Sequence, residues 1–271
     1  FGKLVKLDGL RLSITRALTS ENPDVHRHTG GRPRYCSIDA VVVLRPIGGD
    51  PQLPPDLSQR ISVYSAADGK LRRQLQVPAP RGLAFDPEER LLAVSDGQVV
   101  YVDPATGTCK PLITEHLEDP FDIAVAPDGT LYVSDGGEAH QVKVFSADGR
   151  FLRAIGTPGG RTAGPYDPSR MSNPRGIDID RRGQLWVAEA EYQPKRISWW
   201  RVADGAFLGE KMGPARYGGG GWLDPRDTSR FYYGGMEFAL DWDRGTWELK
   251  QVLWRDSGLP AGAPERPIYY K

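Results

Sequence analysis

Two aspartates in the middle of the chain stand where a divalent cation could bind. Asp122 opens an apolar run of residues, and Asp135 closes the run that follows. If the two runs are neighbouring antiparallel strands, both carboxylates lie at the same end of the sheet. Such a pair raises a pKa, attracts an arginine such as Arg81 or Arg175, or binds a cation of the Ca²⁺ type. Glu189 closes a third run, so Asp122, Asp135 and Glu189 are the candidate metal ligands.

The residues that open these runs also carry chemistry. Arg81 and Arg175 occupy equivalent places in two of the runs, and Phe121 stands at that place in the middle one. Antiparallel pairing predicts that Arg81 meets Asp96 and that Arg175 meets Glu189. Exposed ion pairs of this kind contribute only about 0–1 kcal/mol. Because the three residues open equivalent runs, we expect Arg81, Phe121 and Arg175 to lie at the same end of their sheets, and they are candidate ligand-binding residues.

Two segments rich in glycine and proline, residues 156–172 and 213–222, interrupt the apolar pattern. Loops on a rigid scaffold are where binding residues concentrate. Both segments combine aromatic rings with guanidinium groups, residue types that are enriched at interfaces. The candidate ligand-binding residues here are Tyr166, Arg170, Arg216, Tyr217 and Trp222. The alternative is that Tyr217 and Trp222 pack under the glycine-rich loop.

Catalysis through histidine or serine has less support. The chain has 4 histidines and lacks the Gly-x-Ser-x-Gly motif of hydrolases. His26 and His28 would share one face of a strand, where two imidazoles could bind a metal. The glycines and prolines that flank them indicate a loop instead.

Composition narrows the classes of partner. The 35 Lys and Arg residues balance the 35 Asp and Glu residues, so a nucleic-acid partner is not expected. The sequence lacks the run of roughly 18 apolar residues that a membrane helix needs, so no membrane insertion is expected. Cys36 and Cys109 either pair or remain separate thiols.

The elements that must position these residues come from an internal repeat. Copies of one pattern start at Pro80, Pro120 and Pro174, about 40 and about 54 residues apart. Each copy is a Pro-led apolar run, a turn, and a second apolar run that ends in a polar or acidic residue. This spacing is typical of propeller blades once an insertion is allowed.

A third and a fourth run complete each unit. Residues 141–146 and 151–156 flank Asp148-Gly149, and alternating apolar positions around Asp-Gly predict a β-hairpin. Four antiparallel strands per unit predict an all-β fold, a β-propeller of four-stranded antiparallel blades. The blade count is five to six, with six favoured and the terminal units incomplete. The predicted core consists of Leu83, Phe85, Val94, Ile123, Val125, Val133, Ile177, Ile179, Trp186 and Val187.

We predict one domain over residues 1–271, with clear repeats at 59–210 and diverged blades at 1–58 and 211–271. These repeats resemble the NHL-repeat family, whose units read roughly Pro-x-Gly-Ile-Ala-Val-Asp, then Gly-x-Leu-Tyr-Val-x-Asp, then Arg-Ile-x-Val-Phe and an Asp-Gly hairpin. The resemblance implies a β-propeller, most often six-bladed, that binds protein or RNA or serves as an extracellular scaffold. A minority of the family are metal-dependent enzymes.

Two enzymatic relatives of this fold offer a comparison. Peptidyl-hydroxyglycine lyase-like propellers take zinc ligands from histidines on successive blades, and the Pro-led starts of this chain carry none. Gluconolactonase-like propellers gather a Glu, an Asn and an Asp around a divalent cation. Asn173, which precedes Pro174, matches the amide of that set, and the three candidate metal ligands above supply the carboxylates.

The expected function is therefore a non-catalytic binding or scaffolding module for a protein or glycan partner, in an extracellular or cell-envelope location. The alternative is a metal-dependent hydrolase, lactonase or lyase with Ca²⁺ or another divalent cation near the central channel. The start at Phe1 and the strand-like C-terminal residues predict that the chain is a piece of a longer polypeptide.

Overall fold

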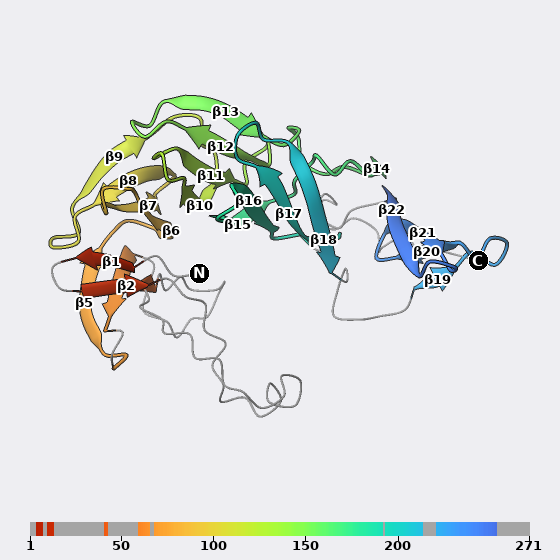
Figure 1. The fold of residues 1–271 in the computed structure, drawn as a ribbon, viewed down its shortest axis with the longest axis horizontal. Coiled ribbons are helices and arrows are strands. Elements are labelled where there is room, and N and C mark those ends of the chain that lie inside the picture. The colour runs from red at the N-terminus through yellow and green to blue at the C-terminus, as the bar shows by residue number, and fades with distance from the viewer. Residues whose placement is uncertain are drawn as a thin grey trace, which may run out of the picture. The chain divides into compact units, whose positions relative to one another are not determined.

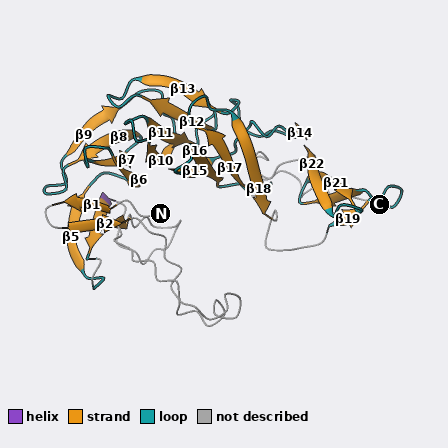
Figure 2. Cartoon of the chain, viewed as in Figure 1, coloured by secondary structure: helices purple, strands orange, loops and turns teal. Residues whose placement is uncertain are grey.

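The computed structural model describes residues 4–7, 10–13, 41–42, 59–65, 68–191, 193–213 and 221–253. These residues form strands and loops, apart from a 3₁₀ position at Gln59, and contain no α-helix (Figure 2). No helix in the described part of the chain is long and apolar enough to cross a membrane. The chain forms two compact units, residues 1–134 with 143–153 and residues 135–142 with 154–271.

Three sheets of four strands follow one another along the sequence, each with its strands in chain order (Figure 1). The first consists of β6 (Pro80–Phe85), β7 (Leu91–Ser95), β8 (Gln98–Val102) and β9 (Cys109–Ile113). The second consists of β10 (Pro120–Val125), β11 (Leu131–Asp135), β12 (Gln141–Phe145) and β13 (Phe151–Ile155). The third consists of β15 (Pro174–Ile179), β16 (Gln184–Glu189), β17 (Lys195–Arg201) and β18 (Phe207–Gly213). The predicted all-β fold of propeller-type four-stranded blades is confirmed, whereas the blade count and the single domain stay predictions.

Less regular sheets lie at both ends of the described chain. The N-terminal strands are β1 (Leu4–Leu7), β2 (Leu10–Ser13), β3 (Val41–Val42), β4 (Arg60–Tyr64) and β5 (Leu71–Gln76). β1 pairs with β2, and β3, β4 and β5 form a separate sheet. The C-terminal sheet has the order β14-β22-β21-β20-β19. Its strands are β14 (Gly164–Pro165), β19 (Trp222–Leu223), β20 (Arg230–Tyr233), β21 (Met236–Asp241) and β22 (Thr246–Val252).

The pairing of β14 with β22 gives the first insertion a structural role. Gly164 lies opposite Val252, and Pro165 lies opposite Gln251. A segment that the sequence marks as a loop therefore supplies a strand to a sheet that is more than 50 residues away in sequence. The insertion is part of the scaffold of the second unit.

Both faces of the β6–β9 sheet are buried. Leu91 and Ala93 pack with Ile61 of the preceding sheet, and Leu92 and Val94 pack with residues of the following one. A strand covered on both sides reads as a continuous apolar run, which explains the sequence of β7. Stacking of successive sheets therefore builds the core of the first unit.

The predicted core is largely confirmed. Phe85, Val94, Ile123, Val133, Ile177 and Val187 are buried, while Leu83, Val125 and Ile179 are partly buried. Trp186 was expected in the core and is instead 37% exposed. Strand alternation places Trp186 on the face opposite Leu185 and Val187, and the sheet that follows in sequence packs its apolar side elsewhere.

Turn chemistry holds the repeat units in register. The Asp86 carboxylate accepts hydrogen bonds from the backbone N–H of Arg90 at 2.8 Å and from its Nε at 2.6 Å, closing the β6–β7 turn. In the β12–β13 turn, Gly149 has φ 88°, a conformation that favours glycine. An added Cβ there would lie 2.3 Å from the carbonyl oxygen of Leu112. The Asp-Gly signal thus marks both a turn and a close approach.

Candidate functional site

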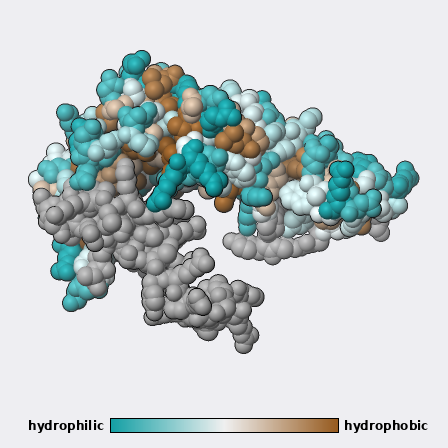
Figure 3. Space-filling view, in the orientation of Figure 1, coloured by the Kyte–Doolittle hydropathy of each residue, from teal (hydrophilic) through white to brown (hydrophobic). Residues whose placement is uncertain are grey.

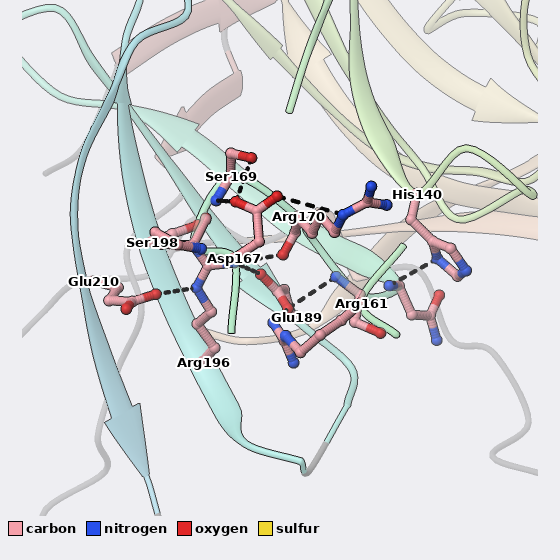
Figure 4. Close-up of polar contacts among 12 residues, drawn as sticks. His140, Arg161, Asp167, Ser169, Arg170, Glu189, Arg196, Ser198 and Glu210 are labelled. Atoms are coloured by element: carbon pink, nitrogen blue, oxygen red, sulfur yellow. Dashed lines mark hydrogen bonds and ion pairs between the residues drawn. The ribbon is translucent and has the colours of Figure 1, made fainter. Parts of the chain in front are cut away.

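A buried cluster of charged side chains joins the first insertion to the β15–β18 sheet (Figure 4). Glu189, at the end of β16, has a side chain that is 0% exposed. Its carboxylate accepts hydrogen bonds from Arg161, from Arg196 Nη1 at 2.8 Å and from the backbone N–H of Ser172 at 2.9 Å. Burial raises the pKa of Glu189, and the cationic Arg161 and Arg196 oppose that shift.

Arg196, in β17, connects Glu189 to further residues of the cluster. Its Nε lies 2.5 Å from Glu210 Oε2, and its Nη1 donates to the backbone oxygen of Arg170 at 2.9 Å. The Tyr166 hydroxyl donates to Glu210 Oε2 at 2.6 Å. Burial, together with this hydrogen bond to a carboxylate, raises the pKa of Tyr166 far above its ordinary value, against the effect of Arg196.

Two guanidinium groups and two carboxylates, those of Arg161, Arg196, Glu189 and Glu210, make the cluster formally neutral. Replacing a buried ion pair by apolar residues is often neutral for stability, but removing one partner is costly because it leaves a buried charge. Figure 4 shows Glu189 between Arg161, from the insertion, and Arg196, from the sheet. The cluster therefore fixes the insertion to the sheet in one arrangement.

The expected pairing of Glu189 with Arg175 needs revision, because its carboxylate is held by Arg161 and Arg196. Sequence reasoning missed these two partners. One signal was present, since Arg196 and Trp200 are four residues apart in β17 and therefore face the same buried side. A charged residue at an inward position predicts a buried partner.

The three candidate metal ligands have different surroundings. Asp122 Oδ1 accepts the N–H of Ile123 at 2.9 Å, Asp135 Oδ1 accepts the N–H of Gly137 at 3.2 Å, and Glu189 lies in the ion cluster. Within the described ranges, no group of three His, Cys, Asp or Glu side chains could hold a metal ion. A divalent cation at these residues stays a prediction.

Arg81 and Phe121 are brought together in the first unit. The Arg81 guanidinium lies 5.8 Å from the centre of the Phe121 ring and donates to the backbone oxygen of Pro120 at 2.6 Å. Its ion pair is with Asp119, so the predicted pair with Asp96 is wrong. The arginine reaches forward to the residues that lead into the next sheet, because β6 and β10 are neighbours.

The candidates in the insertions have mainly structural surroundings. The Tyr166 hydroxyl donates a hydrogen bond to Glu210. Arg170 Nη1 donates to the backbone oxygens of Pro158 at 2.8 Å and Gly160 at 3.2 Å. Trp222 lies in β19 opposite Tyr232 and is 58% exposed. Arg216 and Tyr217 lie outside the described residues, and Arg175 lies half-buried in β15.

The remaining histidines and cysteines also have defined places. His140 Nδ1 accepts the N–H of Asn173 at 3.0 Å, and His116 stacks on the Phe151 ring at 4.6 Å. Cys109 is a free thiol whose pKa is raised by burial. Cys36 and the His26-Arg27-His28 segment lie outside the described residues.

One face of the β15–β18 sheet is open, and we call it the open face, defined by Trp186, Ala188, Ile197, Trp199 and Lys211. Cross-strand pairing places Trp186 opposite Trp199, and Ala188 opposite Ile197, which in turn faces Lys211. Trp186 is 37% exposed and Ile197 47% exposed. Figure 3 shows hydrophobic residues at the surface in the middle of the view, while hydrophilic residues predominate over β19–β22 at its right.

The first repeat shows what this face usually contacts. Leu92 stands at the repeat position of Trp186, and Val94 at that of Ala188. Both are fully buried and pack with Ile123 and other residues of the following sheet. In the first repeat, the face equivalent to the open face therefore packs against a neighbouring sheet.

A groove continues the open face at the end of the sheet. Its volume is about 600 Å³. It is lined by Ala188, Glu189, Ala190, Glu191, Lys195, Arg196, Ile197, Lys211, Met212 and Gly213. The lining combines small and apolar residues with Glu189 and Arg196 of the ion cluster and with two lysines. Such a groove can hold a short apolar segment with a polar group at one end.

A comparison with protein-family models agrees with the repeat pattern. Residues 117–145 match the family model of the NHL repeat. No curated protein sequence matches the chain. Of the solved structures, the nidogen/laminin complex matches at 18% identity and a TM-score of 0.46, over 72% of this chain and 87% of that one.

Two further structures match at lower coverage of their own chains. The Kuenenia stuttgartiensis hydrazine synthase matches at 15% identity and a TM-score of 0.46, over 69% of this chain and 51% of that one. A catalytically inactive virginiamycin B lyase from Staphylococcus aureus with quinupristin matches at 12% identity and a TM-score of 0.42, over 73% and 64%. This chain thus spans only part of those two proteins.

Proposed function

Because residues 117–145 are an NHL repeat within an all-β fold of propeller-type blades, we propose that this chain is a binding and scaffolding module that contacts a protein partner through the open face. The observation that carries the proposal is the exposure of Trp186 and Ile197 on a face whose counterpart in the first repeat is covered by the next sheet.

Exposed apolar surface supports this reading. Single exposed apolar residues are ordinary, whereas contiguous apolar patches mark interaction sites. The rings of Trp186 and Trp199 lie 5.0 Å apart between centres, and Ile197 lies next to them in the sheet. Tryptophan is among the residue types that dominate binding energy at interfaces.

The next sheet along the chain turns its apolar side elsewhere. Met236, Phe238, Leu249 and Val252 form its core and pack with Tyr166 of the insertion and Met212 of β18. The apolar side of the C-terminal sheet is therefore already engaged, and within the described part of the chain it does not cover the open face.

The ion cluster gives the surface rigidity. Glu189, Arg196 and Glu210 are on β16, β17 and β18, and all three take part in the cluster. A preorganised surface loses less conformational entropy on binding. The cluster thus supports the open face from the other side of the sheet.

The experiment compares capture by two single variants with capture by the wild type. Ile197→Ser removes apolar surface from the open face, and Leu152→Ser removes a comparably exposed residue of β13, 43% against 47%. We expect protein partners captured from an extract of the source cells to be lost with Ile197→Ser and kept with Leu152→Ser, with circular dichroism unchanged. Equal capture by all three proteins would overturn the proposal, and capture of glycans alone would replace the protein partner by a sugar.

A further inference from the structure

We propose that the groove and the open face bind an extended segment of the partner in which apolar side chains are followed by acidic ones. This inference rests on the proposed function and specifies the chemistry of the partner. Apolar side chains of the segment lie over Trp186 and Ile197, and its carboxylates lie beside Lys211.

Strand register places aromatic, aliphatic and cationic residues in successive rows along the open face and the groove. The Trp186–Trp199 pair supplies an aromatic end. Next comes the row of Ala188, Ile197 and Lys211, in which the aliphatic residues are followed by a cation. Beyond it, Lys195 lies opposite Gly213 at the groove. An extended segment that crosses these rows meets apolar surface first and positive charge last.

The exposed charge of the groove is positive. Glu189 and Arg196 neutralise each other and both side chains are fully buried. Glu191 lines the groove but is only 8% exposed. Lys211 is exposed, and no ion pair joins it to another described residue. Carboxylates of a partner therefore find a complementary charge, and lysine side chains of a partner do not.

The aromatic end is held flat. An added Cβ on Gly209 would lie 2.4 Å from Trp199 Cζ2, so the indole of Trp199 lies directly over the backbone of β18. The Trp186 Nε1 donates to Asp180 Oδ2 at 3.1 Å, which fixes the neighbouring ring. Two rings held in this way offer a broad apolar surface at low entropic cost.

The test uses three labelled synthetic peptides with the full chain, measured by fluorescence anisotropy. The first has a block of leucines and valines followed by a block of aspartates; in the second and third, lysines or asparagines replace the aspartates. We expect the acidic peptide to bind about tenfold more tightly than the asparagine peptide, and the lysine peptide to bind least. High salt should reduce only the charge-dependent part.

Two charge-reversal variants locate the effect. Lys211→Glu should weaken the acidic peptide about tenfold and improve the lysine peptide. Lys110→Glu, at an exposed position of β9, the outer strand of another sheet, should leave both affinities within about twofold. Binding without charge preference, no binding at millimolar peptide, or equal effects of both variants would overturn the inference. In each of these cases, loss of partner capture by Ile197→Ser would still support the proposed function.

Discussion

Gly82 of β6 and Asp122 of β10 lie in direct contact. A Cβ added to Gly82 would lie 2.2 Å from Asp122 Oδ1 and 2.4 Å from Asp122 Cα. The glycine of the Pro-x-Gly motif thus permits two neighbouring first strands to approach each other. At the equivalent Gly176, an added Cβ would meet only Ala188 Cβ, at 3.9 Å.

Gly82→Ala should therefore destabilise the protein, whereas Gly176→Ala should be tolerated. The clash at residue 82 involves a backbone atom, so rotation of a side chain cannot relieve it. Overpacking of this kind costs about 1–3 kcal/mol in free energy of unfolding. Urea unfolding of both variants measures the difference, and equal stabilities would show that the strands move apart without cost.

The ion cluster gives a second prediction. Glu189→Gln keeps the shape of the side chain but removes the charge that balances the guanidinium groups of Arg161 and Arg196. Breaking a buried ion pair on one side costs about 3–5 kcal/mol in free energy of unfolding. Glu248→Gln, which affects an exposed ion pair with Lys250 at 3.3 Å, is the matched control and should change stability little. Similar thermal denaturation curves for both variants would contradict this view of the cluster.

The sequence predicted the blades because the signals for their strands and turns lie in short stretches of neighbouring residues. Pro80, Pro120 and Pro174 open β6, β10 and β15, and Asp148-Gly149 forms the turn that its dipeptide indicates. Each of these features depends on neighbouring residues only. The sequence alone therefore predicted the strands and turns of the repeat units.

The contacts of the candidate site depend on partners that are distant in sequence. Glu189 and Arg161 are 28 residues apart, and Tyr166 and Glu210 are 44 apart. No periodic pattern links such pairs, because the insertion folds onto the sheet through β14 and β22. The exposure of Trp186 also depends on a distant element. Its repeat position predicts burial, but the sheet that follows in sequence packs its apolar side elsewhere.

A third prediction concerns the aromatic end of the open face. Gly209→Ala places a methyl group where the Trp199 ring now lies, 2.4 Å from Cζ2, so the ring must move away from β18. We expect a red shift of tryptophan emission, because the displaced indole becomes more exposed to water. The control is Gly213→Ala on the same strand, where the added Cβ would lie 3.5 Å from Lys195 Cβ, an ordinary contact. Identical emission spectra of the two variants would contradict the flat placement of Trp199.

Tyr166 gives a prediction about pH. Its pKa is raised in the folded protein by burial and by the hydrogen bond to Glu210, whereas a tyrosine in the unfolded chain has a pKa of about 10. The unfolded chain therefore loses this proton first as pH rises. Stabilisation from the neutral hydroxyl is fully present below about pH 10 and is lost as pH rises towards the pKa of the folded state.

Tyr166→Phe removes both the hydrogen bond and the titrating proton. At pH 7 we expect the variant to be less stable by roughly 1.5–3 kcal/mol, the cost of losing a hydrogen bond to a charged acceptor. Above about pH 10 the difference between wild type and variant should narrow, because only the wild type loses stability through this proton. Urea unfolding at pH 7, 9 and 10.5 measures the difference. A gap that stays constant or widens with pH would mean that the Tyr166 hydroxyl does not remain protonated beside Glu210 when the protein is folded.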